Sequence, residues 1–105
     1  MELAAAVLSF SALGHQPRLE VFRLLVRAGP DGMAAGEIAR ETGARQNTLS
    51  SNLSILTAAG LIVPRRDGRS IIYSAVYERI SELVAFLMED AAAETLRSTR
   101  QPSAK

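Results

Sequence analysis

A cluster of uncharged polar side chains lies within nine residues near the middle of the chain and consists of Gln46, Asn47, Ser50, Ser51 and Ser54. Leu49, Leu53, Leu56 and Gly60 recur every three or four residues, so a helix over Gln46–Ala58 would turn one face to a core and leave the polar groups on the other. Solvated helix faces usually collect Lys and Glu, whereas amides and hydroxyls suit base edges in a DNA major groove. Ser, Thr and Asn also favour helix N-caps, but capping explains one or two of these positions rather than five. We therefore predict a DNA-reading helix with the candidate residues Arg45, Gln46, Asn47, Thr48, Ser50, Ser51 and Ser54.

Three arginines follow this helix around a turn signal. Residues 61–63 and 71–73 are apolar and mostly β-branched, and they flank the sequence Arg-Arg-Asp-Gly-Arg at 65–69, in which Asp-Gly is a strong hairpin-turn signal. Clustered arginines repel one another in the free protein, and a bound polyanion relieves that repulsion. Charge can also protect an edge hairpin from aggregation, but edge protection does not need a polar reading helix before it. The hairpin is predicted to carry the DNA-binding residues Arg65, Arg66 and Arg69.

The composition indicates a small binding module. At 105 residues and 48% hydrophobic content, the chain can bury one core, and we predict one domain over residues 1–95 followed by a disordered tail over 96–105. The net charge of +1 hides a division: residues 40–69 carry five arginines against two acids, a local +3, whereas 70–94 carry one arginine against five acids, a local −4. The basic part coincides with the predicted reading elements, and the acidic part is poorly suited to touching DNA.

Cysteine is absent, and no apolar run in the sequence approaches the length of a membrane span. A disulfide framework and a thiolate metal site are therefore excluded, and no membrane partner is expected. The apolar run over residues 3–14 lacks a basic leader and a small-residue cleavage signal, so we expect a helix of the mature protein rather than a secretory signal. We predict a soluble, cytoplasmic protein.

Apolar spacing and helix breakers divide the remaining sequence into further helices. The first carries Leu3, Val7, Phe10 and Leu13 and breaks at residues 14–17; the second carries Leu19, Phe22, Leu25 and Val26 and ends at 29–32. A short helix over Ala35–Thr42, with Ile38 inward and ended by Gly43, directly precedes the reading helix, which is the spacing of a helix-turn-helix. We predict a mainly α fold with a small β-hairpin: a winged helix-turn-helix with elements in the order α-α-α-α-β-β-α.

The first helix and the last, expected over residues 76–94, each carry an apolar stripe. A monomer with both stripes uncovered would expose a larger apolar patch than soluble monomers usually tolerate. We therefore predict a two-fold homodimer packed through these two helices, with the reading helices one DNA turn, about 34 Å, apart on a palindromic site. The alternative is that both helices complete the core of a monomer. The predicted dimer interface comprises Leu3, Val7, Phe10, Ile80, Leu83, Val84, Leu87 and Met88.

Two segments, LGHQPRLEVFRLLV at 13–26 and GEIARETGARQNTLSSNLSILTAAGLIVPRRDGRSIIYS at 36–74, carry a family resemblance. The chain resembles the ArsR/SmtB family of winged-helix repressors over about residues 8–90. The resemblance implies a dimeric repressor that leaves a double-stranded DNA operator when it binds an effector, often a metal ion or arsenite. It also implies that Gln46, Asn47, Ser50 and Ser51 read bases and that the hairpin arginines hold phosphates or the minor groove.

The sensing residues of that family are not matched. Its metal sensors place Cys pairs in the third helix, or Asp and His on the last helix, because arsenite needs thiolates and zinc needs imidazole or carboxylate ligands. The sequence FLMED at 86–90 resembles an arsenic-responsive subgroup in which two cysteines follow, but Ala91 and Ala92 stand in those places. We predict no metal site, no cofactor and an unknown effector, with arsenite binding only if cysteines were present. A lost sensor, a different effector, or replaced cysteines in an arsenical-resistance regulator all remain open.

Catalysis is not expected of this chain. A nucleophile and base would have to share the single histidine, His15, and no phosphate-cradling glycine loop is present. His15 lies between two predicted helices, where we expect a structural role in capping or packing. The remaining alternative to a DNA-binding regulator is a winged-helix module that binds protein and has no specific DNA target.

Overall fold

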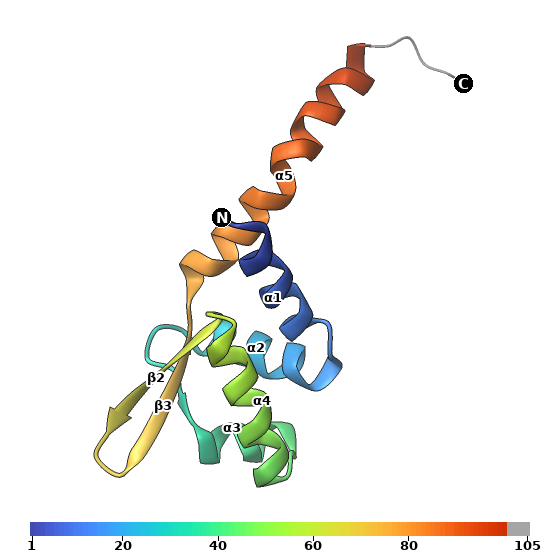
Figure 1. Ribbon diagram of the computed structural model, residues 1–105. Coiled ribbons are helices and arrows are strands. Elements are labelled where there is room, and N and C mark those ends of the chain that lie inside the picture. The colour runs from blue at the N-terminus through green and yellow to red at the C-terminus, as the bar shows by residue number, and fades with distance from the viewer. Residues whose placement is uncertain (101–105) are drawn as a thin grey trace.

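Five helices and three short strands make up the part of the chain that the structure, a computed structural model, describes. It describes residues 1–100, without the side chains of 92, 93, 95, 96 and 98–100. The elements, in chain order (Figure 1), are α1 Leu3–Leu13, α2 Gln16–Ala28, β1 Met33–Ala34, α3 Ala35–Thr42, α4 Gln46–Ala58, β2 Ile62–Asp67, β3 Ser70–Ala75 and α5 Tyr77–Arg100. The predicted winged helix-turn-helix is confirmed, with one strand more than expected.

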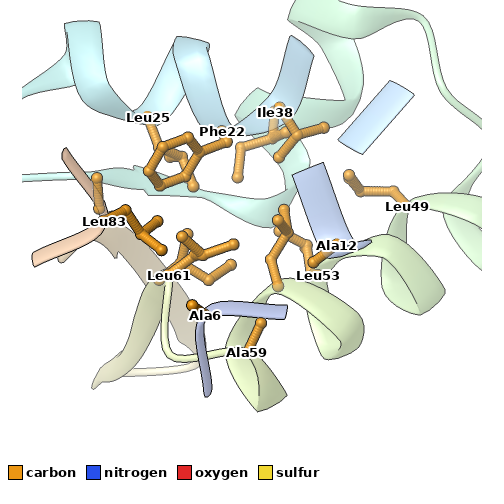
Figure 2. Close-up of a cluster of buried hydrophobic side chains, with 14 residues drawn as sticks. Ala6, Ala12, Phe22, Leu25, Ile38, Leu49, Leu53, Ala59, Leu61 and Leu83 are labelled. Atoms are coloured by element: carbon orange, nitrogen blue, oxygen red, sulfur yellow. The ribbon is translucent and has the colours of Figure 1, made fainter. Parts of the chain in front are cut away.

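The core lies where α2, α3 and α4 meet the start of the sheet. Leu25, Ile38 and Leu61 (Figure 2) are completely buried there, as is Leu56. Each fully buried leucine or isoleucine contributes roughly 1.5–3 kcal/mol of transfer free energy. The helical spacing of Leu49, Leu53 and Leu56 therefore identified the inward face of α4 correctly, and Ile38 points inward as expected.

The sheet is antiparallel, with the strand order β1-β3-β2. The hairpin of β2 and β3, residues 62–75, is the wing of the fold. Met33 pairs with Tyr73 and Ala34 with Ile72, so the residues just before α3 are fixed to β3, the middle strand of the sheet. The sequence predicted only the two strands of the hairpin and missed β1. A strand of two residues shows no alternation of apolar and polar side chains, and only its pairing with β3 defines it.

The hairpin strands are longer than predicted and extend through the arginines. Asp67 pairs with Ser70, so the loop consists of Gly68 and Arg69 rather than of Asp67 and Gly68. Gly68 has φ +64°, and within residues 1–100 no residue other than glycine has positive φ, which is the pattern of a type II′ turn with glycine at its first central position. Arg65 and Arg66 are thus strand residues, and only Arg69 lies in the loop.

The last helix, α5, also exceeds its predicted range and continues to Arg100. Residues 91–100 contain no proline or glycine, and their alanines, glutamate, leucine and arginines favour helix, so no signal ends the helix near Glu94. The helix thus extends over residues 96–100 of the predicted tail, and the remainder of that tail, 101–105, lies outside the described residues. Figure 1 shows α5 projecting from the rest of the molecule. The whole molecule, α5 included, has extents of 61 × 24 × 24 Å.

The two N-terminal helices differ from the sequence prediction in detail. α1 buries Ala6, Ser9 and Ala12, not the larger residues whose spacing defined it. In α2, Leu19 is exposed and Val21 takes the inward position instead. His15 occupies the N-cap position of α2 without a side-chain capping bond and is exposed, so the expected capping or packing role was wrong.

Candidate nucleic-acid interface

The exposed face of α4 carries all the predicted base-reading side chains. At 100° per residue, Asn47, Ser51 and Ser54 lie opposite the buried Leu56. Gln46 and Ser50 lie on the flank toward α3, where both line a shallow hollow with α3 residues. The full predicted set, Arg45, Gln46, Asn47, Thr48, Ser50, Ser51 and Ser54, is exposed. The helix therefore presents amide and hydroxyl groups to any molecule that approaches this side.

The start of α4 is held by a short turn from α3. The Thr42 hydroxyl donates to the Ile38 carbonyl at 2.8 Å, and the Ala44 amide donates to the Thr42 hydroxyl at 3.3 Å. The Asn47 carbonyl Oδ1 accepts a hydrogen bond from the Thr48 amide at 2.8 Å, so Asn47 satisfies one of the free amides of the first turn. A ligand that recruits the Asn47 side chain must compete with that bond.

The other end of α4 is held by the two terminal helices. From α1, the Ser9 hydroxyl donates to the Ala59 carbonyl at 3.2 Å; from α5, Arg79 Nε donates to the Gly60 carbonyl at 3.4 Å. Gly60 has φ +78°, a backbone conformation that favours glycine, and a Cβ there would have to displace the end of the flexible Arg79 side chain. These contacts satisfy carbonyls at the C-terminal end of the helix.

The wing arginines point in different directions. Arg65 pairs with Ile72 and Arg66 with Ile71 across the hairpin, and adjacent strand residues point to opposite faces. Arg65 Nη2 donates to the Asp31 carbonyl at 3.0 Å, which ties β2 to the loop before β1. The three arginines therefore do not share one loop tip, because Arg65 and Arg66 lie on β2 and only Arg69 lies in the loop, although all three are exposed.

The hairpin tip and the start of α4 lie at the same end of the molecule, away from α5 (Figure 1). Within residues 1–100, the ion pairs are Arg79–Glu82 and Arg97–Glu94, so the arginines of the wing keep uncompensated charge. The local excess of basic residues in 40–69 is thus gathered at the end that carries the polar face of α4, where it would attract an anion.

The predicted dimer residues divide into two groups. Leu3 (66% exposed), Val7 (57%) and Phe10 on α1, and Val84, Leu87 and Met88 on α5, are all exposed. Leu83 is only 5% exposed because it packs into the protomer's own core, and Ile80 is half-buried against that core. Leu83 was therefore placed wrongly as surface for a partner, whereas Ile80 keeps part of its surface and stays a prediction.

The positions matched to the cysteines of the resembled subgroup lie on α5. Ala91 is exposed, and the side chain of Ala92 lies outside the described part of the structure. Among the described residues, no three His, Cys, Asp or Glu side chains gather as a metal site would require. Within the same residues, no helix has both the length and the apolar composition to cross a membrane.

Three structurally important side chains and one backbone carbonyl were missed in the sequence. Ser9 and Arg79 hold the end of α4, the Asp31 carbonyl holds Arg65, and Asn52 is buried on the inner face of α4. A weak signal existed for two of them: Ser9 is the polar member of a face that is otherwise alanine, and Asn52 interrupts a leucine stripe.

Comparison with known proteins places the fold in a family. A model of the helix-turn-helix domain matches residues 13–65. The uncharacterized HTH-type transcriptional regulator Rv0081 of Mycobacterium tuberculosis is 34% identical over 76 residues, which is 72% of this chain but 65% of that protein. The chain thus spans just under two thirds of that relative.

Two further relatives match over most of both chains. The HTH-type transcriptional regulator YgaV of Escherichia coli is 36% identical over 86 residues, 82% of this chain and 83% of that protein. The solution structure of the homodimeric winged helix-turn-helix DNA-binding domain of Mb0332 from Mycobacterium bovis, a possible ArsR-family transcriptional regulator, has a TM-score of 0.68 at 30% identity and covers 96% of this chain and 90% of that one. These are regulators rather than enzymes. The chain belongs to the ArsR-type family of winged helix-turn-helix transcriptional regulators.

Proposed function

We propose that this protein is a homodimeric, sequence-specific DNA-binding repressor that binds a palindromic operator and is released by an effector. The observation that carries the proposal is the polar face of α4 beside a basic wing at one end of the molecule. Exposed Asn47, Ser50 and Ser51 are groups that discriminate base edges, and Arg66 and Arg69 are groups that contact phosphates. Repression and release follow the behaviour of the family.

The outward apolar faces of α1 and α5 support the homodimer. Leu3, Val7 and Leu87 are each more than half exposed in the protomer, and a second copy would cover them across a two-fold axis. The M. bovis relative is a homodimer. In such a dimer two α4 helices would reach successive major grooves, about 34 Å apart. We place the protein in the cytoplasm, where the DNA is.

The effector is expected to differ from arsenite. Arsenite needs soft thiolate ligands, and the chain has no cysteine. The positions of Ala91 and Ala92 therefore mark a lost or replaced sensor rather than an active one.

The test is fluorescence-anisotropy binding to the DNA upstream of the protein's own gene and to a scrambled duplex, at several salt concentrations. We expect two protomers per site, a preference for the upstream DNA, and affinity that falls steeply with salt because phosphate contacts release counterions. Equal and weak binding to both duplexes would overturn the proposal and favour the protein-interaction module.

An Asn47→Ala variant sharpens this test. Losing a base-reading amide should reduce discrimination between the two duplexes by about 1–3 kcal/mol while leaving binding to scrambled DNA almost unchanged. Ser11→Ala, an exposed residue of α1, is the matched control and should alter neither affinity. Unchanged discrimination in Asn47→Ala would remove Asn47 from the reading face.

A further inference from the structure

A cavity of about 250 Å³ lies behind the reading face, between α2, the turn from α3 to α4, and α4 itself. Pro17, Val21 and Ala44 form its apolar wall, and the polar groups around it come from Glu20, Thr42, Thr48 and Asn52. The cavity contacts both helices of the helix-turn-helix. At roughly 30 Å³ per water-sized group, it has room for a ligand of about eight non-hydrogen atoms.

Asn52 is the unusual member of this lining. Its residue is 5% exposed, yet the hydrogen bonds found in the described part of the chain include none to its side-chain amide. Among the described residues, every side-chain nitrogen or oxygen without solvent contact has a hydrogen-bond partner. Since the Asn52 amide has no such partner, its atoms must keep some solvent contact, and they keep it where Asn52 lines the cavity. The amide is therefore free of protein partners in the described part of the chain and open to a molecule in the cavity.

The other polar groups define the chemistry of that partner. The Thr42 hydroxyl is occupied, since it donates to Ile38 and accepts from Ala44. The Glu20 carboxylate accepts one hydrogen bond, from Gln16 Nε2 at 3.0 Å, and an ionised carboxylate offers about four acceptor positions. Glu20 is the charged group of the lining. The site therefore combines spare acceptors and a negative charge with an amide that both donates and accepts.

We infer that this cavity is a binding site for a small organic cation, an amine that carries an amide or hydroxyl group a few bonds from its ammonium. The ammonium pairs with Glu20, and the neutral polar group pairs with Asn52. Asn47, Ser51 and Ser54 lie on the other side of α4, so of the predicted DNA-binding residues only Thr48 also borders the cavity. The inference rests on the cavity alone and does not require the proposed function.

Glycinamide, with five non-hydrogen atoms, is the probe, and its binding to the full chain is followed by 15N–1H NMR. We expect shifts confined to the residues around the cavity, including the Asn52 side-chain amide, with a Kd of about 1 mM or lower, which is within the range open to a ligand of this size. Glu20→Gln and Asn52→Leu should each weaken binding at least tenfold. Glu41→Gln, which removes an exposed carboxylate of α3 outside the cavity, is the matched control and should bind like the parent.

Three results would overturn the inference: no shifts up to 100 mM glycinamide, shifts that persist in both cavity variants, or equal binding of acetamide, which lacks the ammonium. Thermal unfolding of Asn52→Leu gives an independent readout. Leucine removes the amide that would pair with the ligand, so the increase in Tm caused by glycinamide in the parent protein should be lost. If Asn52→Leu fails to fold, Glu20→Gln at an exposed position decides the question by itself.

Discussion

Helix α4 and the terminal helices α1 and α5 carry apolar residues at the same helical spacing, but these residues are buried on α4 and largely exposed on α1 and α5. On α4, Leu53 is 2% exposed and the polar residues face outward; on α5, Leu87 is 56% exposed although it belongs to an equally regular stripe. α1 goes further and buries Ala6, Ser9 and Ala12 while Leu3, Val7 and Phe10 face outward. A helical stripe therefore indicates that a face will be covered, but it does not tell whether the cover is the protomer's own core or another molecule.

The first prediction tests the inward region. Leu56→Ala removes a fully buried side chain of α4 and should lower the free energy of unfolding by about 2–5 kcal/mol, through lost transfer energy and a residual cavity. Urea unfolding at several protein concentrations measures it. The loss should be the same at every concentration, because the protomer core is affected; a loss that disappeared at high concentration would assign Leu56 to the same class as Leu87.

The second prediction tests the outward region. Leu87→Glu places a charge on the exposed apolar face of α5 and should weaken dimerisation at least a hundredfold, about 2.7 kcal/mol, because an unpaired charge would be buried between the two copies. Sedimentation equilibrium measures the dissociation constant. Ala85→Glu adds the same charge to an exposed residue on the opposite side of the same helix and should leave the dimer intact. Equal behaviour of the two variants would show that this stripe does not face a partner.

The third and smallest effect compares two neighbouring arginines of the wing. Arg66→Ala should weaken binding to all DNA sequences alike, by about tenfold or less, and reduce the slope of log affinity against log salt by about 0.9. Arg65 is engaged with the Asp31 carbonyl, so Arg65→Ala should change that slope less. Arg97→Ala, on the distal part of α5, is the control. An unchanged slope in Arg66→Ala would show that the outer face of the wing makes no phosphate contact.

The fold was largely predictable because its core follows simple periodicities. The leucines of α4 and the short helix with Ile38 occurred where their local pattern indicated, and the Asp-Gly signal marked the hairpin, with the turn one residue later than expected. What failed depended on partners far along the chain. β1 exists only through its pairing with β3, and Arg65 and Arg66 became strand residues because the register of β3 continues past them.

The candidate site was predictable in part for the same reason. Exposure of the polar residues of α4 follows from the helical period, so all of them are where the sequence placed them. The direction of Arg65 and the burial of Leu83 do not follow from a local period. Arg65 bonds to a loop, and Leu83 packs into a core, that other segments form. Asn52 could be recognised as polar at an apolar position, but only the structure shows that a cavity lies beside it.

The joint at the base of α5 has a mechanical consequence. The 24-residue helix is about 36 Å long at 1.5 Å per residue, so a tilt of 5° at its base would displace its far end by about 3 Å. The base of α5 is held by two hydrogen bonds: Tyr77 donates to the Val26 carbonyl, and Arg79 donates to the Gly60 carbonyl. In the proposed dimer, the stiffness of those few contacts would set how accurately two copies keep the distance between their α4 helices, and hence how much variation in half-site spacing an operator could have.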